Sequence, residues 1–221
     1  MVGALEDQVL TAPGMRVFNP ALKPRSGSSL VTHFLQRYPR TLPARWLVLR
    51  LSDATSELVV SCHDVVQIRK TQAGLAAHTY VKGDRDQAYA TALSRFASYI
   101  ADHSRNGPRL RVARPLVQQA EAPGRWLVRI GLIGMESAEM AAAPRTGKVR
   151  ISLLQAETLA VLGVRGRPTD LAVAQADVAI LDAIAGTKWT ASGEPTTRLH
   201  APPSILPFAG CFEVALPVTN P

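Results

Sequence analysis

Aromatic residues and cysteines are both scarce in this chain, and their scarcity limits what the chain can be. Phe, Trp and Tyr make up 5% of the residues whereas 47% are hydrophobic, so a core must be built from Leu, Val, Ile and Ala. The two cysteines, Cys62 and Cys211, lie far apart without the CxxC spacing of zinc sites, so we expect no structural metal. One disulfide would join them, but two free thiols are the simpler expectation.

Long apolar runs and common catalytic signatures are missing as well. No stretch approaches the roughly eighteen apolar residues of a membrane span, so we expect no transmembrane segment. Residues 1–7 are acidic and lack a charged-then-apolar signal pattern, which favours the cytoplasm or the interior of an organelle. A leader removed from a longer precursor is also compatible with the sequence. Glycine-rich phosphate loops, HExxH and a Ser-His-Asp order are absent.

Basic residues outnumber acidic ones, 25 to 17, which gives the chain a formal charge of +8. A basic surface favours anionic partners such as phosphates, carboxylates or nucleic acid. The cations are spread as single Arg residues between apolar ones, and no run of five like charges occurs. Without a recognisable motif, charge alone does not point to nucleic acid, and we expect no such partner.

The first sixty residues differ from the rest. They are rich in Pro, Gly and Ser, which is typical of an extended arm. A short helix at 30–38, stopped by Pro39, and strands at 46–51 and 58–62 are the elements we expect near its end. We therefore divide the chain into an N-terminal extension, residues 1–60, and a domain, residues 61–221.

The domain contains two similar halves, at about residues 65–135 and 148–218. In the first half, two strands over 66–69 and 75–81 precede a helix over 85–103, whose apolar residues fall at three- and four-residue steps. Two more strands follow, over 110–117 and 126–132. The second half repeats this order with a steady offset of 83 to 84 residues, including a helix from about Thr169 to Ala185. We infer a pseudo-twofold α+β domain with two helices against a curved antiparallel sheet.

This layout resembles the SOUL haem-binding-protein family over about residues 62–218. The segments that carry the resemblance have the family's order and spacing, and they are Val66-Gln67-Ile68-Arg69, Ala76 to Asp84, Phe96 to Ala101 with Asn106-Gly107, Val112 to Val117, and His200-Ala201-Pro202-Pro203 with Pro207-Phe208 and Glu213-Val214. The family's Arg-Asn before Glu-Val is here Cys211-Phe212. The first sixty residues have no counterpart.

The resemblance implies a distorted antiparallel β-barrel of two four-stranded halves, each with one long helix packed on it. It also implies affinity for haem or related tetrapyrroles, and a likeness to GyrI-like domains, whose groove between the halves takes small molecules. Some members of that wider group hydrolyse ligands with a glutamate in the pocket.

Several side chains are candidates for such a groove. His200, on a proline-stiffened loop, is a candidate iron ligand or carboxylate donor, and His78 shares a strand face with Ala76 and Tyr80. Cys211 is a further candidate ligand or nucleophile, and Glu213 would share its side of the last strand as a general acid or base. A loop His, a core thiol and a structural Glu paired with an Arg are the plainer alternatives.

The first helix and its neighbouring strand supply the other candidates. Tyr89, Leu93 and Phe96 lie near one helix stripe that belongs either to the core or to the ligand. Arg114 is one of several Arg residues that could pair with a ligand carboxylate, and Phe208 adds an aromatic ring to the last loop.

Three functions remain open at this stage. The first is a non-enzymatic protein that binds a tetrapyrrole or another flat apolar molecule. The second is a small-molecule hydrolase or isomerase that uses Glu213. The third is a structural subunit that keeps the scaffold and docks on a larger complex through residues 1–60, since extended proline-rich arms suit docking.

Overall fold

The computed structural model describes residues 57–63, 65–106, 110–133, 147–200 and 211–220, and two short strands at 17–18 and 51–52. The helix expected at 30–38, most of the strand expected at 46–51 and the proline-rich loop over 201–210 lie outside the described residues. The described part contains no helix whose length and apolar character would let it span a bilayer.

The two halves have matching elements. The first half consists of β4 (Val66–Lys70), β5 (Gly74–Lys82), α2 (Arg85–Asn106), β6 (Arg111–Ala122) and β7 (Arg125–Ile133). The second consists of β8 (Arg150–Leu154), β9 (Thr158–Arg165), α3 (Asp170–Ile184), β11 (Thr196–Leu199) and β12 (Cys211–Thr219). The remaining strands are short or peripheral, namely β1 (Val17–Phe18), β2 (Leu51–Ser52), β3 (Leu58–His63) and β10 (Thr190–Ala191).

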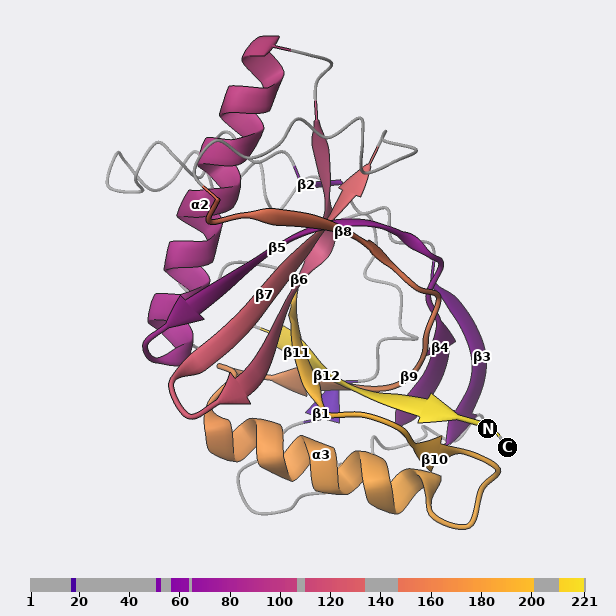
Figure 1. Ribbon diagram of the computed structural model, residues 1–221. Coiled ribbons are helices and arrows are strands. Elements are labelled where there is room, and N and C mark those ends of the chain that lie inside the picture. The colour runs from indigo at the N-terminus through magenta and orange to yellow at the C-terminus, as the bar shows by residue number, and fades with distance from the viewer. Residues whose placement is uncertain are drawn as a thin grey trace, which may run out of the picture.

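The sheet confirms the pseudo-twofold arrangement. Its strand order is β3-β4-β9-β12-β11-β6-β7-β5-β8. If each strand in the run from β4 to β8 is exchanged for its counterpart in the other half, the same order results, read from the opposite end. The first strand of each half pairs with the other half, β4 with β9 and β8 with β5. The sheet curves into a distorted barrel that does not close, and α2 and α3 lie on its outer side (Figure 1).

Local sequence signals position both helices. Asp84 accepts a hydrogen bond from the backbone N–H of Gln87 at 2.7 Å, and the Asp84 N–H approaches the Gln87 side chain at 3.4 Å, so the two residues form a capping box at the start of α2. Thr169 caps α3 by accepting from the Ala172 N–H. Gly83 and Gly166, which correspond between the halves, both adopt positive φ before their helices, as glycine permits.

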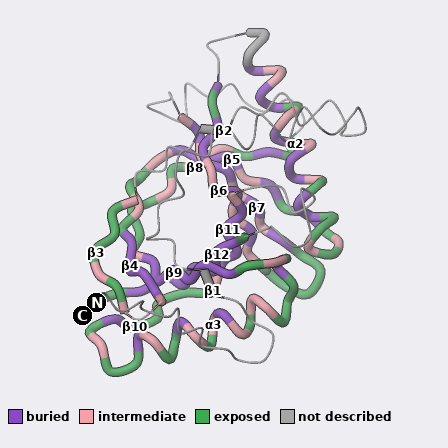
Figure 2. Tube along the Cα trace, turned by 180° about the vertical axis from the view of Figure 1, so that it is seen from behind, coloured by how far each residue is buried: buried purple, intermediate pink, exposed green. Residues whose placement is uncertain are grey.

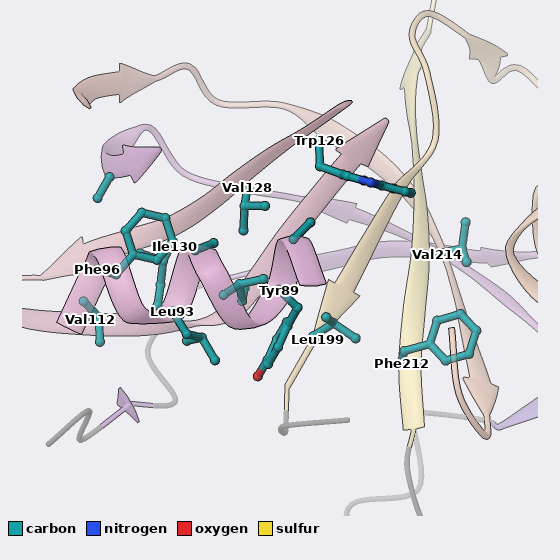
Figure 3. Close-up of a cluster of buried hydrophobic side chains, with 14 of the residues drawn as sticks. Tyr89, Leu93, Phe96, Val112, Trp126, Val128, Ile130, Leu199, Phe212 and Val214 are labelled. Carbon is teal, nitrogen blue, oxygen red and sulfur yellow. The ribbon is translucent and has the colours of Figure 1, made fainter. Parts of the chain in front are cut away.

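The core is one apolar cluster shared by both halves. Alternate residues of β7 point to the helix side and are buried, as are those of β12, and α2 packs on β5 and β7 while α3 packs on β12 and β9. Figure 3 shows Phe96 of α2 near Val128 and Ile130, with Phe212 and Val214 of β12 across the same cluster. The exposed large hydrophobic residues of the described part lie mainly on β3 and α3, and Figure 2 shows exposed stretches along both elements.

A shared core predicts that the halves unfold together. Replacing the fully buried Phe96 by Ala should lower the free energy of unfolding by about 3–5 kcal/mol, and Ile180→Ala in the other half by about 2–5 kcal/mol. Val178→Ala on the exposed face of α3 is the matched control and should cost under about 0.5 kcal/mol. Urea denaturation followed by circular dichroism should give a single transition for each variant, and two separable transitions would contradict a shared core.

Candidate functional site

A groove of about 820 Å³ lies on the side of the sheet that faces away from the helices, and both halves line it. Alternate residues of β6, Val117 and Gln119, form one wall together with Arg129 of β7 and Arg198 of β11. Trp189, which is buried with the apolar core, is an aromatic residue of the lining. The turns before β5 and β9 close one end, where Thr71 and Glu157 hydrogen-bond to each other through backbone and side-chain atoms.

A buried carboxylate, Glu213, stands beside this groove on β12. Its Oε1 lies 2.9 Å from Nη1 of Arg69, and its Oε2 accepts a hydrogen bond from Nε2 of His200 at 2.9 Å. Nε of Arg198, the register partner of Glu213 on β11, lies 3.8 Å from Oε2. Glu213 therefore has two guanidinium groups and an imidazole around it.

A second carboxylate, Glu57, completes an ion-pair network. It pairs with Arg69 at 3.3 Å and also with Arg198, so two acids and two guanidinium groups alternate. Arg69 also donates to Gln67 at 3.0 Å. All four charged side chains are about nine-tenths buried, a degree of burial that requires such pairing because an unpaired charge would be strongly destabilised there.

This network sets the ionisation of Glu213. Burial alone would raise the pKa of its carboxyl group, but the hydrogen bond from His200 and the charges of Arg69 and Arg198 outweigh it and lower the pKa to about 2. Glu213 is therefore ionised at neutral pH and cannot serve as a general acid. A carboxylate with so low a pKa is also a weak general base, because base strength falls with pKa.

Sequence reasoning found two members of this site and missed three. His200 and Glu213, both candidates from the sequence, are brought together. Glu57, Arg69 and Arg198 were missed because the strand pairing that joins them crosses the two halves. The available signal was alternation: a charged residue between apolar ones on a strand that is buried on both faces has to find a partner.

The other candidates near β12 and β5 stand apart from the groove lining. Cys211 begins β12 and is partly exposed, and burial followed by the nearby Glu213 raises the pKa of its thiol despite the opposing charge of Arg165. His78 lies on the groove side of β5 with Nδ1 3.1 Å from the Ser152 hydroxyl. Burial and then the charges of Arg150 and Arg129 lower its pKa.

The candidates from the first helix belong to the core. Tyr89, Leu93 and Phe96 pack between α2 and the sheet and are not among the groove-lining residues (Figure 3). Arg114 is half-buried on β6, and Phe208 lies outside the described residues. In the described ranges, no group of three or more His, Cys, Asp or Glu side chains could hold a metal ion.

Comparison with known proteins identifies the fold. No family model matches the chain, and no curated protein matches its sequence. Among solved structures, EcmrR in a complex with DNA has a TM-score of 0.53 at 9% identity, covering 87% of this chain. The isolated C-terminal domain of EcmrR has a TM-score of 0.51 at 10% identity, over 71% of this chain and 98% of that domain.

A hydrolase from Listeria innocua is similar to the same degree, with a TM-score of 0.52, 14% identity and coverage of 70% of this chain and 91% of the hydrolase. This chain spans only 65% of the EcmrR chain in the DNA complex. At such identities the likeness concerns the fold alone. The protein therefore has the GyrI-like fold.

The pKa of Glu213 predicts how acid affects stability. A carboxyl whose pKa falls from 4.5 to about 2 on folding contributes about 3 kcal/mol above pH 4.5, and this contribution disappears as the pH falls towards 2. Glu213→Gln should lose about 3 kcal/mol of unfolding free energy at pH 7, and the deficit should shrink below pH 4.5. Glu121→Gln, at an exposed acid on β6, is the control. Equal stability of Glu213→Gln and wild type at neutral pH would refute the network.

Proposed function

We propose that this protein binds a flat, apolar small molecule in the groove and does not transform it chemically. The observation that carries the proposal is the groove itself, with Trp189 on its wall and both halves around it. Its volume of about 820 Å³ lies within the range of about 300–1,000 Å³ that is usual for small-molecule sites. Leu154, Leu159 and Val117 add apolar residues to the lining.

A tetrapyrrole, haem in particular, is the ligand that we propose to test first. The SOUL-like order of the sequence favours it, and a planar macrocycle suits an indole wall because flat aromatic systems stack on each other. The candidate iron ligand His200 does not line the groove, and its Nε2 is hydrogen-bonded to Glu213. Burial of the macrocycle is therefore the binding mode that we propose, and iron ligation by His200 would require that bond to open.

The two other functions have less support. A hydrolase that uses Glu213 agrees with the likeness to the Listeria innocua hydrolase, but an acid held by Arg69 and Arg198 with a pKa of about 2 is poorly suited to proton transfer. For an assembly role through residues 1–60, the two described strands of that segment pair within this chain, β1 with β9 and β2 with β6. Neither observation favours these functions over binding.

Titration with haemin and with metal-free protoporphyrin IX tests the proposal. Haemin should shift its Soret band on binding, and both porphyrins should quench tryptophan fluorescence because Trp189 lines the groove. Trp189→Phe should reduce this quenching by the share that Trp189 contributes to the emission of the three tryptophans. An unshifted Soret band together with unquenched fluorescence would rule out tetrapyrrole binding.

The iron ligand is tested by comparing the two porphyrins in one variant. If the macrocycle alone is recognised, His200→Ala should leave the affinities for haemin and protoporphyrin IX close to each other. A loss confined to haemin would show instead that His200 ligates the iron.

A further inference from the structure

We propose that the groove recognises a carboxylate group of its ligand through Arg129 and Arg198, and that it therefore prefers anionic molecules to neutral or cationic ones. The proposal rests on the proposed function, because it presumes that a small molecule occupies the groove. It adds the chemical class of that molecule and the side chains that select it.

The sheet places the two arginines in the same cross-strand register, on either side of Val117. Arg198 of β11 is in register with Val117 of β6, and Val117 is in register with Arg129 of β7. Two strand spacings put the Cα atoms of the arginines about 10 Å apart. All three residues line the groove. The short apolar Val117 offers no hydrogen bond to either guanidinium, so it leaves the space between them available to a ligand.

The unpaired polar atoms of the groove lining are all donors. Nε and Nη1 of Arg198, Nε of Arg129 and Nε1 of Trp189 are buried and have no hydrogen-bond partner among the described residues, and Nε of Arg198 has only the longer 3.8 Å ion-pair contact to Glu213. The Arg198 side chain is only 4% exposed. A buried donor without an acceptor costs free energy, and a cluster of them predicts a ligand that supplies acceptors. A carboxylate supplies two oxygens and donates nothing when ionised.

The charge of the wall also points to an anion. Glu57 and Glu213 are matched by Arg69 and Arg198, whereas Arg129 makes no ion pair in the described part of the chain. Arg129 donates through Nη2 to Gln119 at 2.9 Å, a neutral partner that orients the guanidinium without cancelling its charge.

Charges elsewhere around the groove do not reverse this sign. The acidic residues of the lining, Glu157 and Glu194, are exposed, and Lys70 is exposed with them. On the far side of Arg129, His78 of β5 is in register with both Arg129 of β7 and Arg150 of β8. After burial, these two cations are the reason that the pKa of His78 is lowered, as expected where positive charge is in excess.

A matched pair of fluorescent probes tests the preference. Pyrenebutyrate and pyrenebutanol share one flat apolar ring system and differ in a carboxylate against a hydroxyl group. Both should accept energy from tryptophan, so quenching reports binding. We expect pyrenebutyrate to bind at least about tenfold more tightly at low salt, because hydrogen bonds to a charged group are about twice as strong as neutral ones. Arg129→Gln should weaken pyrenebutyrate much more than pyrenebutanol, so that most of this difference is lost.

Two further variants make the result specific. Arg125→Gln, at an exposed residue of the same strand outside the groove lining, should retain the wild-type preference. Arg198→Lys keeps the positive charge but cannot donate two parallel hydrogen bonds to a carboxylate. It should therefore lower the affinity for pyrenebutyrate more than the affinity for pyrenebutanol. Circular dichroism and the urea midpoint show whether each variant is folded, which matters for Arg198 because of its ion pairs.

The outcomes separate this proposal from the function beneath it. Equal binding of the two probes, or a preference that survives Arg129→Gln, would overturn the carboxylate site while leaving a small-molecule groove intact. A failure of haemin to bind, with pyrenebutyrate still preferred, would remove the tetrapyrrole and keep the carboxylate site. Absence of pyrenebutyrate binding would overturn the carboxylate site outright.

Discussion

The buried carboxylate of Glu213 is the constraint on which the rest of this structure depends. A charge at that depth is tolerated only with partners, and its partners come from different strands: Arg69 from β4 and Arg198 from β11. Glu57, the residue before β3, pairs with both arginines. Removing one member would leave others buried and uncompensated, which is strongly destabilising. The network thus fastens β4, the strand that crosses between the halves, to the centre of the sheet.

The same network shapes what the groove can do. Because the negative charge of Glu213 is already compensated by Arg69 and Arg198, it offers little attraction for a cationic ligand. Its low pKa also leaves it little capacity for proton transfer. Among the described residues, Arg129 makes no ion pair, and it is separated from Arg198 by Val117 across the sheet. Donors on Arg129, Arg198 and Trp189 that have no hydrogen-bond partner within the described ranges then favour a ligand that brings acceptors. Binding of an anion, rather than acid–base catalysis, is the chemistry that these side chains support.

Much of the fold could be predicted from the sequence, whereas the site could be predicted only in part. The offset between the halves and the three- and four-residue steps of the first helix are local signals, and the structure confirms them. The convergence of Arg69 with Arg198 depends on β4 pairing with β9 of the other half, which no local pattern encodes. The spacing of apolar residues also predicts that one face of α2 is buried, but it does not predict whether a ligand or the sheet covers that face. Phe96 on this face lies in the core.

The central claim is that Arg129 and Arg198 together receive a carboxylate, and proton–nitrogen NMR of arginine side chains tests it most directly. In a titration with pyrenebutyrate, the Nε–H resonances of Arg129 and Arg198 should move together to saturation, because neither Nε atom has a hydrogen-bond partner among the described residues of the free protein. That of Arg69, which already donates to Gln67, should stay in place. Saturable binding that leaves the Arg129 and Arg198 resonances unmoved would contradict the account.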